Sequence, residues 1–298
     1  MPSLKSRLFY HAVKHQLRKM ASSGADLAQV RAARDKSSAQ MFTVPAGVQV
    51  KPAQLGNCPG EWLRPPDGDP KSVMLYLHGG AYITGSCQTH RGLTGHLAKA
   101  AGMDGFLLDY RLAPEHPFPA ALDDALAAYL ALHSERPTRA IVLAGDSAGG
   151  GLAIALALRL RDTGQPMPAA MALLSPWTDL TLSLPTHQSK AAVDPFFPDS
   201  RTLTSAAQMY VGSGDLTQPW VSPHFAALHD LPRTLIHVGE LEALLGDAQA
   251  LAAGMHAAGT RVQLQEFEGM WHVWQIFAGR FAEADASVKQ LGAFLRSV

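Results

Sequence analysis

The stretch AIVLAGDSAGGGLAIALALRL, residues 140–160, decides the fold. Residues 140–144 form a short apolar run typical of a buried strand, and residues 148–160 repeat Ala and Leu as a helix packed on a sheet does. Between them, glycines flank Ser147 in a G-x-S-x-G pattern, which permits a turn too tight for larger side chains. The stretch therefore predicts a strand, a sharp turn and a helix, with Ser147 held out at the end of the strand.

Short apolar runs alternate with helical segments on both sides of this stretch. The predicted strands are residues 72–77, 105–109, 140–144, 170–174, 234–238 and 262–267. The predicted helices are residues 120–132, 148–161, 245–258 and 281–296. Strands separated by helices form a mostly parallel sheet covered on both faces, and the chemistry of such sheets gathers at the carboxyl ends of the strands.

Two segments interrupt this alternation. Residues 1–40 have a helical pattern, and residues 184–218, which are rich in proline and aromatic residues, connect two predicted strands. Long connections inside compact domains often act as lids. We expect the two segments to pack together as a cap over the strand ends, with residues 41–183 and 219–298 forming the α/β domain.

The composition excludes several classes of protein. Hydrophobic residues make up 47% of the 298 residues, enough for a large core, and Lys+Arg and Asp+Glu balance at 25 each. No excess of basic residues indicates a nucleic-acid partner. The only two cysteines, Cys58 and Cys87, do not have the spacing of metal ligands. We therefore expect no metal site and no nucleic-acid partner.

The N-terminal stretch bears on where the protein resides. It is basic but has no apolar core of signal-peptide length, and no apolar run in the chain is long enough to span a bilayer. We expect a cytoplasmic protein without a membrane partner. Leu4, Leu8 and Ala12 share one helical face, so a helix lying on a membrane surface is the alternative to a helix packed on its own protein.

A second glycine-rich turn, HGGA at residues 78–81, directly follows the predicted strand 72–77. Backbone N–H groups of such a turn stabilise the negative charge that develops on a carbonyl oxygen during acyl transfer. The predicted oxyanion hole comprises Gly79, Gly80, Ala81 and Ala148. Within it, Gly79 is expected mainly to keep the turn tight, and His78 to support the turn through a hydrogen bond.

Five motifs together resemble the bacterial hormone-sensitive-lipase-like esterases, one branch of the α/β-hydrolases. They are HGGAYITG, DYRLAPEHPFPAALDD, GDSAGG, SPWTDL and GMWHVW, in the family's order, from about residue 72 to the C-terminus. The resemblance implies an α/β-hydrolase fold: a central, mostly parallel eight-stranded sheet with helices on both faces and a helical cap. It also implies cofactor-free hydrolysis of carboxylic esters with short or medium acyl chains. Asp109, Tyr110 and Arg111 match a structural signature of the family and are expected to be scaffold.

His272 is the predicted general base among thirteen histidines. In this fold the chain order is nucleophile, acid, histidine, and His272 follows the last predicted strand, where the family has its G-M-x-H pattern. A neutral imidazole there accepts the proton of the predicted nucleophile, Ser147, and later gives it to the leaving group. His237, by contrast, lies inside a predicted strand and is expected to be packed.

The triad acid is less sharply defined by the sequence. The family has an Asp followed by Pro-Leu in the loop after the strand at residues 234–238, whereas this chain reads GELEALLGD at residues 239–247. Aligning Ala-Leu with Pro-Leu selects Glu242 as the acid. Glu240, Asp247 and Asp179 remain alternatives.

The motifs predict a carboxylesterase acting on a small-molecule ester through Ser147, His272 and Glu242. A related hydrolase of amides, lactones or peptides is the alternative, because the same triad cleaves amides; a non-catalytic ligand-binding member is a further one. The predicted pocket residues are Trp177, Phe196, Phe197 and Trp274. The sequence leaves the oligomeric state open, a homodimer included.

Overall fold

An eight-stranded sheet runs through the centre of the molecule. The computed structural model describes residues 2–21, 26–135, 140–198 and 200–298. The strands, in the spatial order β1-β2-β4-β3-β5-β6-β7-β8, are β1 (Gln49–Leu55), β2 (Cys58–Arg64), β3 (Asp69–Leu77), β4 (Met103–Leu108), β5 (Ala140–Asp146), β6 (Ala170–Leu174), β7 (Arg233–Gly239) and β8 (Val262–Phe267). β2 is antiparallel to both its neighbours, and the other pairs are parallel. The predicted mostly parallel sheet is confirmed.

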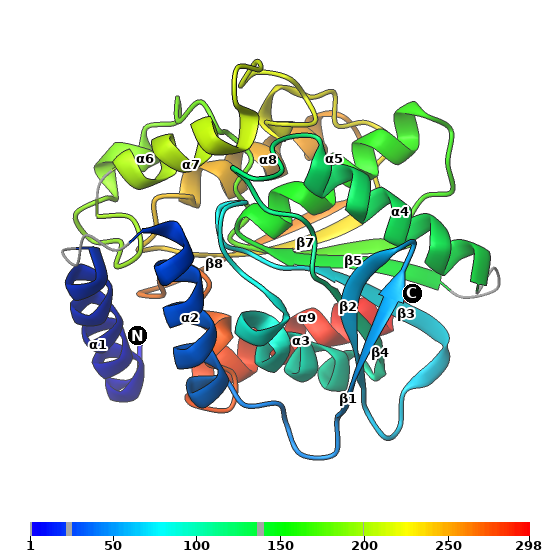
Figure 1. The fold of residues 1–298 in the computed structure, drawn as a ribbon, viewed down its shortest axis with the longest axis horizontal. Helices are drawn as coiled ribbons and strands as arrows, with labels where there is room; N and C mark the ends of the chain where they lie inside the picture. The colour runs from blue at the N-terminus through cyan, green and yellow to red at the C-terminus, as the bar shows by residue number, and fades with distance from the viewer. Residues whose placement is uncertain (1, 22–25, 136–139, 199) are drawn as a thin grey trace.

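Helices cover both faces of this sheet (Figure 1). They are α1 (Leu4–Ala21), α2 (Leu27–Met41), α3 (Cys87–Ala101), α4 (Ala120–Glu135), α5 (Ala148–Asp162), α6 (Thr186–Ser189), α7 (Arg201–Val211), α8 (Leu245–Ala257) and α9 (Ala282–Arg296), with short 3₁₀ helices η1 (Pro223–Phe225) and η2 (Trp274–Phe277). α3 and α9 pack on one face, and α4, α5 and α8 on the other. No helix within the described residues is long and apolar enough to cross a membrane.

Strands β1 and β2 were missed by the periodicity argument. They form an antiparallel hairpin whose turn residues, Gly56 and Asn57, both have positive φ. A Gly-Asn pair between two extended segments is a hairpin signal, but Pro52 and Pro59 argue against a strand because proline cannot donate to a ladder. The structure places β1 at the edge of the sheet, where proline is tolerated.

Helix α3 was also missed, because its two glycines lower its helix propensity. Both are needed for packing: a Cβ on Gly92 would lie 2.8 Å from the Phe42 carbonyl oxygen, and one on Gly95 would lie 3.1 Å from Pro45. The segment that leaves α2 therefore runs directly over α3. Tertiary contact overrides local propensity here.

Helix α1 contacts both η2 and the segment that follows β6. Phe9 of α1 packs edge-on against Phe277, with ring centroids 5.2 Å apart. The Tyr10 hydroxyl donates a hydrogen bond to the Val193 carbonyl at 2.6 Å, and Lys14 Nζ donates to the Ala192 carbonyl at 2.9 Å. Two segments far apart in the sequence thus lie side by side beyond the carboxyl ends of the strands (Figure 1).

A buried ion pair fastens the second of these segments to α8. His187 Nε2 lies 2.6 Å from Asp247 Oδ2, and neither side chain is exposed. Asp247 Oδ1 also accepts the backbone N–H groups of Thr178 and Asp179, each at 2.9 Å. Burial disfavours a charged imidazole, but the hydrogen bond and the charge of Asp247 outweigh burial and raise the pKa of His187.

This pair predicts a pH-dependent contribution to stability. Because the folded-state pKa of His187 lies above its unfolded value of about 6.5, the contribution is complete below that value and is lost as the pH rises through the folded-state pKa. Urea unfolding should therefore show a larger stability difference between wild type and His187→Gln at about pH 5.5 than at about pH 9. His229→Gln, which removes an exposed pair with Asp230, is the matched control. Equal differences at the two pH values would contradict the assignment.

Candidate active site

The turn between β5 and α5 holds Ser147 in a strained conformation. Its φ is 54° and its ψ is −123°, a combination that non-glycine residues seldom adopt. The turn is tight because α5 starts against β3: a Cβ on Gly149 would lie 2.0 Å from the Leu77 carbonyl oxygen. Ser147 N–H donates to the Leu174 carbonyl at 2.8 Å. The backbone, rather than side-chain packing, aims the hydroxyl away from the sheet.

The structure brings Ser147, His272 and Glu242 together in one hydrogen-bonded chain. His272 Nε2 lies 3.0 Å from Ser147 Oγ, and His272 Nδ1 lies 2.7 Å from Glu242 Oε2. These partners assign the Nδ1–H tautomer, in which Nε2 is free to accept the serine proton. Ser147, His272 and Glu242 come from the loops after β5, β8 and β7, so the arrangement lies at the carboxyl ends of the strands.

Glu242 is completely buried and its second carboxylate oxygen is also occupied. Oε1 accepts hydrogen bonds from the Ser175 hydroxyl, at 2.8 Å, and from the Gly239 backbone N–H. Ser175 Oγ in turn accepts the N–H of Val273, the residue after the histidine, at 3.2 Å. Sequence reasoning missed Ser175, although it opens the SPWTDL motif. The Ser175 hydroxyl joins the loop after β6 to Glu242 and to the backbone beside His272.

Glu242 favours the protonated form of His272 in spite of burial. Burial alone lowers the pKa of an imidazole, but the hydrogen bond and charge of Glu242 outweigh burial and raise the pKa of His272.

The three other carboxylates that the sequence offered as the triad acid, Glu240, Asp247 and Asp179, have other partners. Glu240 accepts the Gly269 N–H at 3.0 Å, Asp247 pairs with His187, and Asp179 accepts from Thr181 and Ser183.

The turn after β3 lies beside Ser147 and is supported from below. Gly79 N–H donates to Asp146 Oδ1 at 3.0 Å, so this group is engaged in holding the turn. Within the described residues, the N–H groups of Gly80 and Ala81 have no protein acceptor. Ala148 N–H, at the start of α5, has no partner within its helix. Three N–H groups are therefore available near the serine.

His78 has the supporting role expected for it. Its Nδ1 lies 2.8 Å from the Gly79 carbonyl, and its ring stacks on Tyr110 with centroids 4.2 Å apart. Burial, reinforced by the neighbouring His90, lowers the pKa of His78 to about 3. The Tyr110 hydroxyl donates to the His78 carbonyl at 2.7 Å, and Arg111 forms an ion pair with Asp124. Asp109, whose Oδ1 accepts the Cys87 N–H at 3.1 Å, completes this scaffold.

Asp194 links the segment after β6 to the loop that carries Glu242. It is completely buried, and its Oδ2 accepts the backbone N–H of Ala243, the residue after Glu242, at 2.7 Å. Its Oδ1 accepts the N–H groups of Phe196 and Phe197. Burial raises the pKa of Asp194 to about 6, against the charge of His272 and the hydrogen bond from Ala243, which lower it. No sequence motif indicated this residue.

A cavity of about 470 Å³ opens over Ser147 and His272. Phe196 and Phe197 line it, and most of its remaining wall comes from α1, α2, the turn after β3 and the segment around η2. The prediction is wrong for Trp177 and Trp274, which are completely buried and do not line the cavity. Trp177 packs in the core and donates its ring N–H to the Asp179 carbonyl, while Trp274 packs on Phe267. Their hydrophobicity serves packing, which sequence cannot distinguish from pocket lining.

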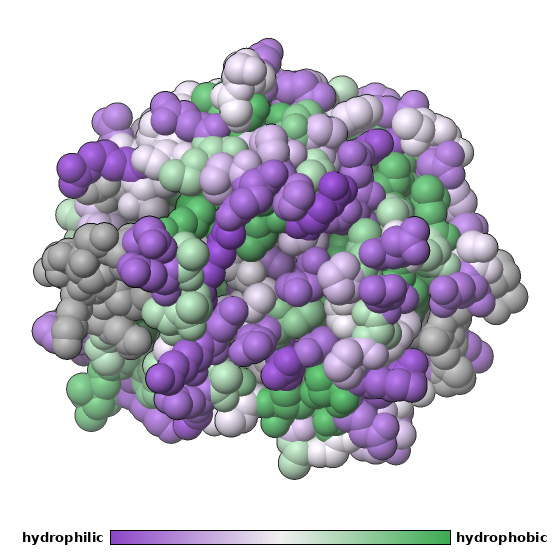
Figure 2. Space-filling view, in the orientation of Figure 1, coloured by the Kyte–Doolittle hydropathy of each residue, from purple (hydrophilic) through white to green (hydrophobic). Residues whose placement is uncertain are grey.

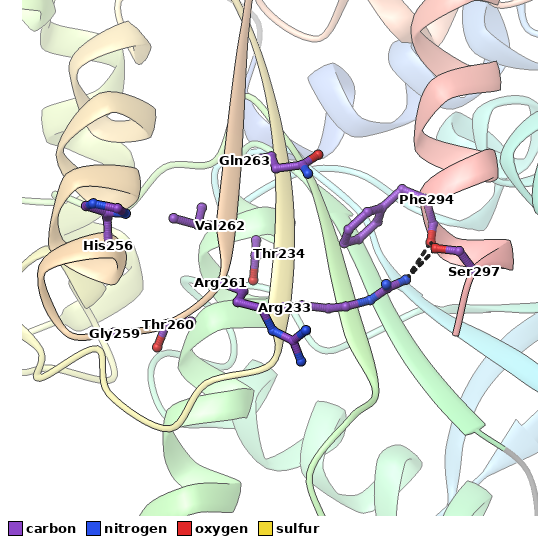
Figure 3. A pocket seen from close by; sticks show the side chains of 10 residues that line it. All are labelled: Arg233, Thr234, His256, Gly259, Thr260, Arg261, Val262, Gln263, Phe294 and Ser297. Atoms are coloured by element: carbon purple, nitrogen blue, oxygen red, sulfur yellow. Dashed lines mark hydrogen bonds between the residues drawn. The ribbon is translucent and has the colours of Figure 1, made fainter.

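Another hollow lies at the opposite end of the sheet, where β7 and β8 begin (Figure 3). The hydrogen bond drawn in the figure joins Arg233 to Ser297 Oγ at 2.7 Å. None of its lining residues belongs to the chain of hydrogen bonds around Ser147. The cavity over Ser147 is therefore the candidate substrate site.

Comparison with known proteins places this arrangement in a family. Residues 74–276 match the family model described as having the alpha/beta hydrolase fold. The chain is 42% identical to an acetyl-hydrolase of Streptomyces hygroscopicus, over 82% of this chain and 81% of that protein. It is 34% identical to an esterase of Acinetobacter venetianus, over 87% and 86%. A crystal structure of an esterase from the bacterial hormone-sensitive lipase family superposes with a TM-score of 0.93 at 37% identity, covering 100% of this chain and 99% of that one.

The chain belongs to the bacterial hormone-sensitive-lipase family of α/β-hydrolases.

For this α/β-hydrolase, the geometry predicts one unusually reactive serine. Ser147 is 5% exposed but borders the cavity and touches an imidazole, so an organophosphate such as paraoxon should phosphorylate it selectively. Peptide mass spectrometry should find the label on Ser147 and lose it in Ser147→Ala. Ser222, a buried serine whose hydroxyl accepts the Leu180 N–H, is the internal control and should stay unlabelled. A stable label on another serine would contradict the assignment.

Proposed function

We propose that this protein is a carboxylesterase that hydrolyses esters of short to medium acyl chains through an acyl-enzyme on Ser147. The observation that carries the proposal is the hydrogen-bonded chain Ser147–His272–Glu242 at the floor of a largely apolar cavity. A non-catalytic member of the family does not need a serine, a histidine and a carboxylate joined by hydrogen bonds in this way. The esterase names of the relatives point to the same reaction class.

In the acylation step, Ser147 Oγ attacks the ester carbonyl carbon while His272 Nε2 takes the serine proton. The carbonyl oxygen becomes an oxyanion and accepts hydrogen bonds from the N–H groups of Gly80, Ala81 and Ala148. Glu242 holds the imidazole in the required tautomer and stabilises the imidazolium. When the tetrahedral intermediate collapses, the bond to the alcohol oxygen breaks and His272 protonates the departing alcohol.

Deacylation repeats this sequence with water. His272 takes a proton from water, the hydroxide attacks the acyl carbon, and the carboxylic acid leaves as Ser147 recovers its proton. Every proton moves between Ser147, His272, water and the substrate. The chemistry therefore needs only the chain's own residues.

The cavity sets the expected substrate size. Its volume of about 470 Å³ suits a small ester better than a long acyl chain. Residues 1–40 and 184–218 act as its cap in this proposal, since α1, α2 and the Phe196–Phe197 pair form its walls. On the face shown in Figure 2, apolar residues occur in small patches separated by polar ones, unlike the broad apolar surface of an interfacial lipase.

A panel of p-nitrophenyl esters tests this function. We expect kcat/KM to be highest for acetate to hexanoate esters and to fall steeply for palmitate, because the cavity cannot enclose the longer chain. Ser147→Ala should lower ester hydrolysis by roughly three or more orders of magnitude while leaving thermal unfolding unchanged. The matched p-nitroanilides should react far more slowly than the esters. Faster cleavage of the anilides would assign the protein to amide chemistry instead.

The acid of the triad has its own test. Glu242→Gln should lower kcat by roughly 100-fold or more with little change in KM, because the amide keeps the shape but loses the charge. Since only neutral His272 accepts a proton, wild-type activity should rise with pH through a midpoint above about 6.5, where Glu242 holds the pKa of His272. In Glu242→Gln that midpoint should move to lower pH.

Glu240→Gln is the matched control for this test. Glu240 lies two residues away, and its carboxylate binds the Gly269 N–H rather than the imidazole. It should retain the wild-type rate and the wild-type pH midpoint. If Glu240→Gln and Glu242→Gln behave alike, Glu242 is not the acid.

A further inference from the structure

The substrate cavity contains a guanidinium in a mostly apolar wall. Arg34 of α2 lines the cavity beside Leu27, Val30 and Phe197. Its Nη1 donates a hydrogen bond to Thr84 Oγ1 at 2.9 Å. A guanidinium carries five N–H donors, so most of its donors remain unused by this contact.

The charge of Arg34 stands apart from the carboxylates in the part of the chain that the structure describes. Within the described residues, Arg34 forms no ion pair. Two carboxylates come to mind as partners of Arg34, Asp35 because it is the next residue and Asp146 because it lines the same cavity, but both bind other groups. Asp35 Oδ1 accepts the Ser86 hydroxyl at 2.6 Å. The Asp146 carboxylate contacts Tyr76, Gly79 and His90. Burial accordingly lowers the pKa of Arg34 with no opposing contribution from an acid.

Arg31, one helical turn earlier, shows what a structural arginine looks like in the same helix. Its guanidinium makes a bidentate ion pair with Glu115, at 2.8 Å for each oxygen, and also donates to the carbonyls of Ile83 and Ala113. These bonds fasten α2 to the loops below it. Arg34 makes no comparable set of contacts, so holding α2 in place does not explain it.

Arg34 is also close to the reacting centre. Thr84 Oγ1, which accepts its hydrogen bond, donates to the Gly80 carbonyl at 3.0 Å. Two hydrogen bonds thus link Arg34 to Gly80, whose N–H group is one of the proposed oxyanion donors and would make the third hydrogen bond, to the substrate carbonyl. Arg34 and Ser147 line the same cavity, so a single bound substrate can contact both.

We propose that Arg34 selects esters that carry a carboxylate a few bonds from the scissile carbonyl. A carboxylate suits a guanidinium because both groups are planar and form two parallel hydrogen bonds. The apolar walls around Arg34 exclude water and strengthen this attraction. The inference rests on the proposed function: it names the substrate class for the same site.

Two matched ester pairs test the inference and identify which side of the ester carries the charge. Ethyl butyrate and monoethyl succinate differ in a carboxylate at the end of the acyl chain; phenyl acetate and 4-acetoxybenzoate differ in one on the leaving group. We expect wild type to favour the charged member of one pair. Arg34→Met should lower the charged-to-neutral ratio of kcat/KM for that pair by about 10- to 100-fold, as expected for a lost hydrogen bond to a charged group. Arg34→Lys should recover part of the ratio, since it restores the charge without the planar fork.

Two control variants separate charge recognition from support of the turn. Thr84→Val removes the contact with Arg34 but leaves the cation, so it should lower the rates of both esters by similar factors and keep the ratio. Arg31→Gln removes a cation of the same helix that lies outside the cavity lining, and it should also keep the ratio. If Arg34→Met instead behaves like Thr84→Val, Arg34 only supports the turn and the inference is overturned.

The outcomes distinguish this inference from the function on which it rests. Ser147-dependent hydrolysis of the neutral esters, with a ratio insensitive to Arg34, overturns the inference and leaves the esterase standing. Absence of hydrolysis of all four esters overturns both. A ratio that falls in Arg34→Met and recovers in Arg34→Lys supports both.

Discussion

The contact between two backbones, at Gly149 and Leu77, is the constraint on which the site depends. Because α5 starts against the end of β3, the chain between β5 and α5 has to turn within one residue, and Ser147 takes the strained conformation. The same contact brings the turn after β3 next to the serine. Ser147 and the N–H groups beside it are thus positioned by one backbone contact, which leaves no room for a side chain at residue 149.

Buried carboxylates then fix the loops around this turn. Asp146 receives hydrogen bonds from Tyr76 and Gly79, Glu242 from Ser175 and Gly239, and Asp194 from three backbone N–H groups. Although burial opposes ionisation of Asp146, its contacts with His90 and Tyr76 lower its pKa. Each carboxylate joins segments distant in the sequence. The site is rigid because its charges are satisfied by fixed backbone and side-chain donors rather than by water.

Sequence predicted those parts of the molecule whose signal is local. β3 to β7 contain short apolar runs, β8 alternates apolar and polar residues, and the turns at Ser147 and His78 follow strands directly, so residue type and position suffice. The acid was harder, because Glu242 departs from the family's Asp; alignment of two neighbouring residues selected it, and its role remains a proposal. Asp194 and Arg34 had no local signal, because their roles arise only from contacts across the fold, and the SPWTDL motif that Ser175 opens did not reveal its contact with Glu242. Trp177 and Trp274 show the reverse error, since a large apolar side chain suits a core and a pocket equally.

The bond from Ala243 to Asp194 has a consequence for engineering the family. Exchanging residues 184–218 for the corresponding segment of a relative is an obvious way to alter which esters are accepted, because Phe196 and Phe197 come from it. Such a chimera also exchanges the acceptor that holds the loop of Glu242. A donor segment without an aspartate at that place would leave a buried N–H group unpaired beside the acid. Its loss of turnover would then be mistaken for a change in specificity, so residue 194 has to be kept when the rest of the segment is replaced.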